Sequence, residues 1–301
     1  MKRYKILIVC GGGIFGCIPA RLLARLPADR QTMRGIDTLS GCSIGGILAA
    51  AYASGKSFGV IDQVFQERAP ECFTKRLVAK LNPLAVPIYR TDTLDRVIHD
   101  MIGGTLMIDV HKTYPGLTLV IPSLDVTDDH YTVFENISRA WDDKKLADIA
   151  GYTSAAPTYY AGRNMEGHCL VDGGIIEVDP LITTVSTINN HLGIPLSEMD
   201  ILMLGTGKDK DKDKDKLTPE KYNSLGYYGM AKDFFVPYVT LSNKLSTWEA
   251  ARQLRLGWFE YFNPLETNGK LDDVKQIPSL IEETDKYAGT FLHVWEEWLS
   301  R

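Results

Sequence analysis

The sequence predicts an α/β protein in which a mostly parallel central sheet carries helices on both of its faces. Three observations support this fold class. Short β-prone segments alternate with helical or turn-rich stretches, two strand–turn–helix units open the chain, and the first strand candidate is continuously apolar, as expected for a strand covered on both faces. The chain has 301 residues, 45% of them hydrophobic and 24% charged, which is enough apolar material for one large domain.

The two opening units have the same order of elements. In the first, Tyr4–Cys10 is a β-prone run, and Ile18–Leu26 repeats its apolar residues at helical spacing. In the second, Ile36–Leu39 is a short strand, Ser40–Ser43 is a turn and Ile44–Ala53 is an alanine-rich helix. Each unit therefore places a tight turn between the end of a strand and the start of a helix.

The remainder of the chain continues this alternation and shows no internal repeat. Further strand candidates are Leu117–Ile121, Tyr131–Phe134, Cys169–Val171 and Ile201–Leu204. We expect a single domain over residues 1–301, with a charged surface loop at 206–220, where Lys and Asp alternate, and an aromatic-rich helical part at 221–301. In that last part, Phe291, Trp295 and Trp298 recur at helical spacing, which is more typical of core packing than of a lipid anchor.

Composition excludes several classes of protein. A net charge of −5 argues against nucleic-acid binding, because neutralising phosphates requires clustered Lys and Arg. The cysteines show neither metal-binding spacing nor the density of a disulfide framework, so we expect no metal and a cytoplasmic location: Cys10, Cys17, Cys42, Cys72 and Cys169. The apolar run Ile6–Val9 is shorter than the roughly 7–15 residues of a signal peptide core. No run reaches the ~20 apolar residues of a spanning helix, so contact with lipid is expected to be peripheral.

The segment Gly41-Cys42-Ser43-Ile44-Gly45 fits the G-x-S-x-G nucleophile elbow. In such an elbow a strand turns sharply into a helix and exposes the serine oxygen, and the flanking glycines, here Gly41 and Gly45, leave the turn enough space. The helix that starts at Ile44 directs the positive end of its dipole toward developing negative charge. A glycine-rich turn with an exposed serine is the alternative, but the flanking strand and helix favour Ser43 as a nucleophile.

The glycine-rich segment Gly11–Gly16 lies between the first strand and the first helix and has two interpretations. As G-x-G-x-x-G it could bind the pyrophosphate of a dinucleotide, but Asp29 and Asp37 fit the acidic residue of that motif only loosely. Alternatively, the bare backbone N–H groups of Gly11, Gly12 and Gly13 suit an oxyanion hole, and the elbow in the next unit favours this second interpretation.

The base that would activate Ser43 is less obvious from the residues alone. An elbow hydrolase commonly orders its triad as serine, acid and histidine, but His191 and His293 do not lie in a glycine-rich or strand-end context. Asp172 is the best-marked acid, because it follows a β-prone segment and precedes two glycines. A turn-forming role for Asp172 remains an equal alternative at this point.

Five segments together resemble the patatin-like phospholipases. They are the glycine loop Gly11–Gly16 followed by Pro19-Ala20, the elbow block Gly41–Ala49, Thr153–Tyr160, Val171-Asp172-Gly173-Gly174 and Leu204-Gly205-Thr206-Gly207. The resemblance extends from the first strand to beyond residue 205. It implies a three-layer sandwich and a lipid acyl hydrolase of the phospholipase A or lysophospholipase type, whose substrate is a lipid or a membrane surface.

The resemblance also implies a catalytic dyad of Ser43 and Asp172, without a histidine and without a cofactor. Ser43 would attack the ester carbonyl, Asp172 would accept its proton, and the amides of Gly12 and Gly13 would hold the oxyanion. Two departures stand out. Phe15 replaces the Arg or Lys that is usual in the family's glycine loop, and Val178 and Asp179 replace the two asparagines that usually precede the proline.

Two further hypotheses keep the fold and change the function. In the first, the protein is an effector that stays idle until a partner or a signalling ligand activates it. In the second, it is a catalytically silent binding or storage protein, because Phe15 has altered the oxyanion loop.

Overall fold

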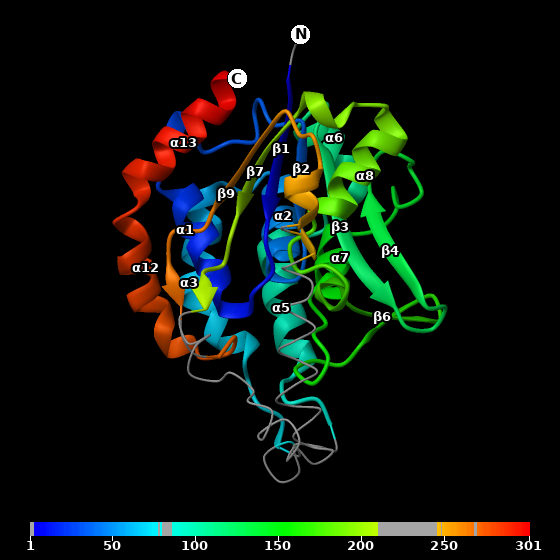
Figure 1. Ribbon diagram of the computed structural model, residues 1–301. Helices are drawn as coiled ribbons and strands as arrows, with labels where there is room; N and C mark the ends of the chain where they lie inside the picture. The colour runs from blue at the N-terminus through cyan, green and yellow to red at the C-terminus, as the bar shows by residue number, and fades with distance from the viewer. Residues whose placement is uncertain (1–2, 78, 80–85, 210–245, 248, 268–269) are drawn as a thin grey trace, which may run out of the picture.

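The computed structural model describes residues 3–77, 79, 86–209, 246–247, 249–267 and 270–301 (Figure 1). The strands are β1 Tyr4–Val9, β2 Thr38–Gly41, β3 Thr118–Asp125, β4 His130–Glu135, β5 Arg163–Met165, β6 His168–Asp172, β7 Met199–Leu204, β8 Lys208–Asp209, β9 Trp258–Phe262 and β10 Glu266–Thr267. The helices are α1 Cys17–Ala24, α2 Ile44–Ala53, α3 Phe58–Cys72, α5 Thr91–Ile102, α6 Val110–Thr113, α7 Leu146–Thr153, α8 Leu181–Leu192, α12 Ile277–Asp285 and α13 Ala288–Ser300.

The strands form a mainly parallel sheet in the order β5-β6-β3-β2-β1-β7-β9, with β4 paired to β3. Five neighbouring strands, from β3 through β2, β1 and β7 to β9, are mutually parallel. Strands β4 and β6 run antiparallel to β3. The predicted mostly parallel sheet is therefore confirmed, and the antiparallel strands are confined to one side of it.

Helices cover both faces of the sheet. Alternate residues of each central strand point to opposite faces, and both sets are apolar, so each face must be covered. Leu7 and Val9 of β1 pack in the larger core, which also contains buried residues of α1, α2, α3, α5, α7, α12 and α13. Ile6 and Ile8 of the same strand pack in a second core with α8. These three layers match the predicted sandwich, and Figure 1 shows α12 and α13 running along one side of the molecule.

The pairing of β3 brings two distant segments to one place. Its residues Val120–Asp125 pair with β4 along one edge. Its other edge is shared, because β2 pairs with residues 118–120 and β6 pairs with residues 123–125. Strand β6 therefore occupies the position that β2 leaves when it turns into α2, and the end of β6 meets the turn after β2.

Of the helical part predicted for residues 221–301, residues 221–245, 248 and 268–269 lie outside the described residues. The described part contains the helices α12 and α13 but also strands. The aromatic segment Trp258–Phe262 is strand β9, which extends the sheet beyond β7. Of the predicted charged loop, Lys208–Asp209 forms β8 and pairs with β10, whereas residues 210–220 lie outside the described residues. The predicted core packing of Phe291, Trp295 and Trp298 is confirmed, since each is at most 1% exposed.

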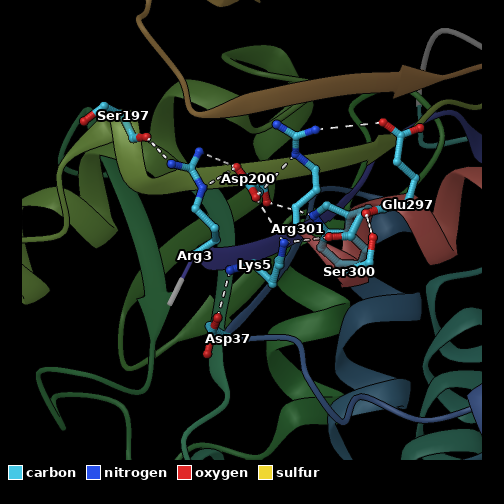
Figure 2. A network of polar contacts seen from close by, with 9 residues as sticks. Arg3, Lys5, Asp37, Ser197, Asp200, Glu297, Ser300 and Arg301 are labelled. Atoms are coloured by element: carbon cyan, nitrogen blue, oxygen red, sulfur yellow. Dashed lines mark hydrogen bonds and ion pairs between the residues drawn. The ribbon is translucent and has the colours of Figure 1, made fainter. Parts of the chain in front are cut away.

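A buried polar network joins the start of β1 to the end of α13 (Figure 2). Lys5 Nζ donates to Asp200 Oδ2 at 3.0 Å and to the backbone oxygen of Trp298 at 2.6 Å. Arg3 Nε also donates to the Asp200 carboxylate, at 3.1 Å, and the indole N–H of Trp298 donates to the Asp200 backbone oxygen at 2.9 Å. Burial raises the pKa of Asp200, but the bonds from Arg3 and Lys5 outweigh it and hold that pKa below its ordinary value.

Candidate active site

Ser43 stands in a strained turn between β2 and α2. Its backbone has φ 56° and ψ −126°, a combination that a residue with a side chain rarely adopts. The turn is tight: a Cβ on Gly41 would lie 2.2 Å from the backbone oxygen of Gly45, and a Cβ on Gly45 would lie 2.0 Å from that of Val9. Only glycine fits at these two positions, as expected for a nucleophile elbow.

Asp172 ends strand β6 and meets the elbow directly. Ser43 Oγ donates to Asp172 Oδ2 at 2.6 Å, although the two residues are 129 positions apart in the sequence. The other carboxylate oxygen accepts the N–H of Gly174 at 2.8 Å. Asp172 is 5% exposed. This burial raises its pKa to about 6, against the lowering effect of the hydrogen bonds from Ser43, Gly174 and Cys42.

No imidazole takes part in this arrangement among the residues that the structure describes. His191 and His293 are exposed, on α8 and α13 respectively. Among the described residues, the base that Ser43 Oγ contacts is the buried carboxylate of Asp172. Its raised pKa makes Asp172 a better proton acceptor than an ordinary aspartate while leaving it mostly ionised at pH 7.

The glycine loop lies beside the elbow, but its three glycines differ in what their amides do. The N–H of Gly11 donates to the backbone oxygen of Val178 at 2.9 Å, so it is already engaged and does not serve as an oxyanion donor in this structure. Within the described part of the chain, the amides of Gly12 and Gly13 have no protein acceptor. Gly13 has φ 58°, and a Cβ there would lie 2.4 Å from the backbone oxygen of Leu271. Gly12 and Gly13 are therefore the candidate oxyanion donors.

The two departures from the usual family pattern have structural roles. Phe15 is 5% exposed and its side chain packs in the larger core. Val178 supplies the carbonyl that holds Gly11, and its side chain lies against the loop. Asp179 is 1% exposed and precedes α8.

Several residues that support the site were not assigned a role from the sequence. Thr206 Oγ1 donates to the backbone oxygen of Gly11 at 2.7 Å, and the N–H of Ile14 donates to the backbone oxygen of Leu271 at 2.9 Å. The Cys42 thiol lies 3.8 Å from Asp172 Oδ1, and Thr153 Oγ1 accepts the N–H of Ser43. Thr206 and Thr153 lie in the motif blocks quoted above, but nothing in the sequence pattern marks Leu271.

None of the described helices has the length and apolar composition needed to span a membrane. Comparison with known proteins gives a match to the family model described as patatin-like phospholipase over residues 7–185. A cGAMP-activated phospholipase of Escherichia coli (strain TW11681) is 29% identical over 281 residues, which cover 84% of this chain and 77% of that protein.

Patatin-like protein 2 of Arabidopsis thaliana is also 29% identical, over 67% of this chain and 59% of its own length, so the chain spans little more than half of that relative. Among solved structures, VipD from Legionella pneumophila aligns with a TM-score of 0.44 and 12% identity, over 94% of this chain and 67% of that one.

Proposed function

This chain belongs to the patatin-like phospholipase family, and we propose that it is a lipid acyl hydrolase that cleaves fatty-acyl esters of glycerophospholipids with Ser43 and Asp172. The observation that carries this proposal is the 2.6 Å hydrogen bond from Ser43 Oγ to a buried carboxylate. The strained elbow supports the same assignment, as do the N–H groups of Gly12 and Gly13, which have no protein acceptor among the described residues.

Acylation begins when Asp172 Oδ2 accepts the proton of Ser43 and Oγ attacks the ester carbonyl carbon. The N–H groups of Gly12 and Gly13 then stabilise the oxyanion of the tetrahedral intermediate. The carbon–oxygen bond to the alcohol breaks, Asp172 passes its proton to the leaving alkoxide, and the fatty acid remains esterified to Ser43. Asp172 next deprotonates a water molecule that attacks the acyl carbonyl carbon. The bond from that carbon to Ser43 Oγ then breaks, Oγ takes back the proton from Asp172, and the fatty acid is released.

The test compares lipid hydrolysis by the wild type and four variants. Ser43→Ala and Asp172→Ala should each abolish fatty-acid release from a mixed lipid extract, as measured by mass spectrometry, and should still give folded protein. His191→Ala and His293→Ala, the matched controls, should leave release unchanged because both side chains are exposed on helices. An inactive histidine variant, or a Ser43→Ala variant with wild-type activity, would disprove the dyad. Failure of the wild type to react with a fluorophosphonate would support the silent binding protein instead.

A second candidate function is a phospholipase of this kind that a ligand switches on. The observation that favours it is a contact between the segment 270–274 and the oxyanion loop, in which the backbone oxygen of Leu271 accepts the N–H of Ile14. The Tyr89 hydroxyl donates to Asp272 in the same segment. A cavity of about 540 Å³ adjoins the segment, and its lining includes Phe73, Lys75, Tyr89, Lys270 and Asp272. A ligand in this cavity would touch the neighbours of the residue that holds the loop.

Two curated relatives, from Escherichia coli and Vibrio cholerae, are named as cGAMP-activated phospholipases, and they align over 84% and 81% of this chain. The second candidate is therefore tested by adding cGAMP to the purified protein and measuring fatty-acid release, with AMP and GMP as controls. A rise in rate with cGAMP alone is expected. Equal rates of fatty-acid release with and without cGAMP would contradict the second candidate and favour a hydrolase that cGAMP does not regulate.

A further inference from the structure

A buried hydroxyl group lies directly behind the nucleophile. Thr153 is the last residue of α7 and is fully buried. Its Oγ1 accepts the backbone N–H of Ser43 at 3.1 Å and donates its own proton to the backbone oxygen of Pro122 at 2.6 Å. One hydroxyl therefore joins a backbone donor of the elbow to a backbone acceptor of strand β3.

This hydroxyl connects the two halves of the dyad. Pro122 precedes Ser123, which pairs with Asp172 across β3 and β6. The Pro122 carbonyl also lies beside the residue after the base, since a Cβ on Gly173 would be 2.6 Å from its oxygen. The position of Thr153 Oγ1 is thus fixed by the strand that also fixes Asp172, and the hydroxyl in turn fixes the peptide that carries Ser43.

The strained backbone of Ser43 makes this contact more than a packing detail. A residue with φ 56° and ψ −126° relaxes toward an allowed conformation unless its surroundings hold it. Rotation of the Cys42–Ser43 peptide would move Oγ away from Asp172 Oδ2, and catalytic proton transfer depends on that short distance. The bond to Thr153 also removes the Ser43 N–H from the set of oxyanion donors, which leaves that task to the glycine loop.

We propose that Thr153 is a positioning residue of the hydrolase, whose hydroxyl holds the Ser43 peptide so that the nucleophile faces its base. The proposal rests on the proposed function, because it assigns a role within the same dyad. It predicts that removal of the oxygen slows the chemical step and weakens the Ser43–Asp172 bond without changing the binding of substrate.

The decisive variant is Thr153→Val, which keeps the shape of the side chain and removes the hydroxyl. The matched control is Ser154→Ala, because Ser154 is also buried in this turn but donates to Ala150 at 2.7 Å, within α7. Thr153→Ser restores the oxygen and should rescue the activity. Reaction with a fluorophosphonate, taken to its end point, counts the competent sites, so that kcat for a short soluble ester is expressed per labelled site.

For Thr153→Val we expect kcat per labelled site to fall by about 10- to 100-fold at unchanged KM, the size of loss that a misplaced reacting group causes. The midpoint of its pH–rate profile should move to higher pH, because the hydrogen bond from Ser43 that lowers the pKa of Asp172 is weakened. A residue with a purely structural role would lower the number of labelled sites and leave kcat per site and the midpoint unchanged.

Wild-type kcat and midpoint in Thr153→Val, or an equal loss in Ser154→Ala, would overturn the proposal. If Thr153→Val and Thr153→Ala both fail to fold while Ser154→Ala folds, the role is structural and the proposal is also overturned. A wild type that neither reacts with the fluorophosphonate nor hydrolyses the ester would instead refute the proposed function itself.

Discussion

Replacement of the buried base by its neutral isostere, Asp172→Asn, is expected to abolish activity and to stabilise the fold at neutral pH. The amide keeps the shape of the carboxylate, its oxygen can still accept the N–H of Gly174, and its NH2 group can donate to Ser43 Oγ. The substitution therefore removes a buried negative charge and leaves the local hydrogen bonds in place.

The magnitude follows from the pKa. Burial raises the pKa of Asp172 from its ordinary value of 3.8 to about 6. The native protein therefore binds this proton more tightly than the unfolded chain does. As pH rises from about 4 to about 6, the unfolded chain releases the proton first and the free energy of unfolding falls. A difference of about 2 in pKa corresponds to about 3 kcal/mol, and above pH 6 this whole destabilisation is present.

The assay is urea denaturation at pH 4.0, 5.0, 6.0 and 7.5, followed by tryptophan fluorescence, since Trp295 and Trp298 are buried. Asp172→Asn should unfold with the wild-type free energy at pH 4.0 and should gain up to about 3 kcal/mol by pH 7.5.

Asp285→Asn provides a control of opposite sign. Hydrogen bonds from Arg25 and Arg21 lower the pKa of Asp285, so its charge stabilises the fold above the unfolded pKa, and its loss should destabilise the protein at pH 7.5. If Asp172→Asn were no more stable than the wild type at pH 7.5, the argument that burial of the charge raises this pKa would be wrong.

Three further outcomes follow from the site and the fold. The kcat/KM of the wild type should rise with pH through a midpoint near 6, because Asp172 of the free enzyme must be ionised to accept a proton, and a flat pH profile of kcat/KM would contradict this assignment. Gly13→Ala should lower kcat by about 100-fold in an ester assay, because a Cβ at this position would collide with the carbonyl of Leu271 and displace the loop. An unchanged kcat would mean that the oxyanion donors lie elsewhere. Phe15→Arg, which introduces the usual basic residue, should lower the free energy of unfolding by about 3–5 kcal/mol because the position is buried. A variant that is as stable as the wild type and faster would refute the argument from burial.

The parts of the fold that local pattern determines were predicted well from the sequence. Helix α2 has the predicted bounds, Ile44–Ala53, because its apolar alanine-rich run and its flanking turns leave no competing pattern. Strand β2 was predicted to end at Leu39, yet it continues to Gly41. Ser40 and Gly41 are turn formers by local preference, but both are buried and pair with β1, so tertiary pairing overrides that preference.

The parts that depend on long-range contacts could not be predicted in this way. The segment Trp258–Phe262 has no alternation to mark it as a strand, and its pairing with β7 decides its conformation. Similarly, Leu271 holds the oxyanion loop through its backbone oxygen, which leaves no signature in the identity of the residue. Motif blocks were sufficient to predict that Ser43 and Asp172 face each other. In contrast, the hydrogen bond from the Gly11 amide to Val178 could be found only once the structure showed where Val178 lies.

The network around Asp200 has a consequence for synthesis of the chain on the ribosome. The partner of Lys5 at the Trp298 carbonyl lies 293 residues further along the sequence. At roughly 5–20 residues per second, translation needs on the order of 15–60 s to reach it, and during that time the nascent first strand lacks its closing contact. The first strand would therefore gain this stabilising contact only after residue 298 has been synthesised.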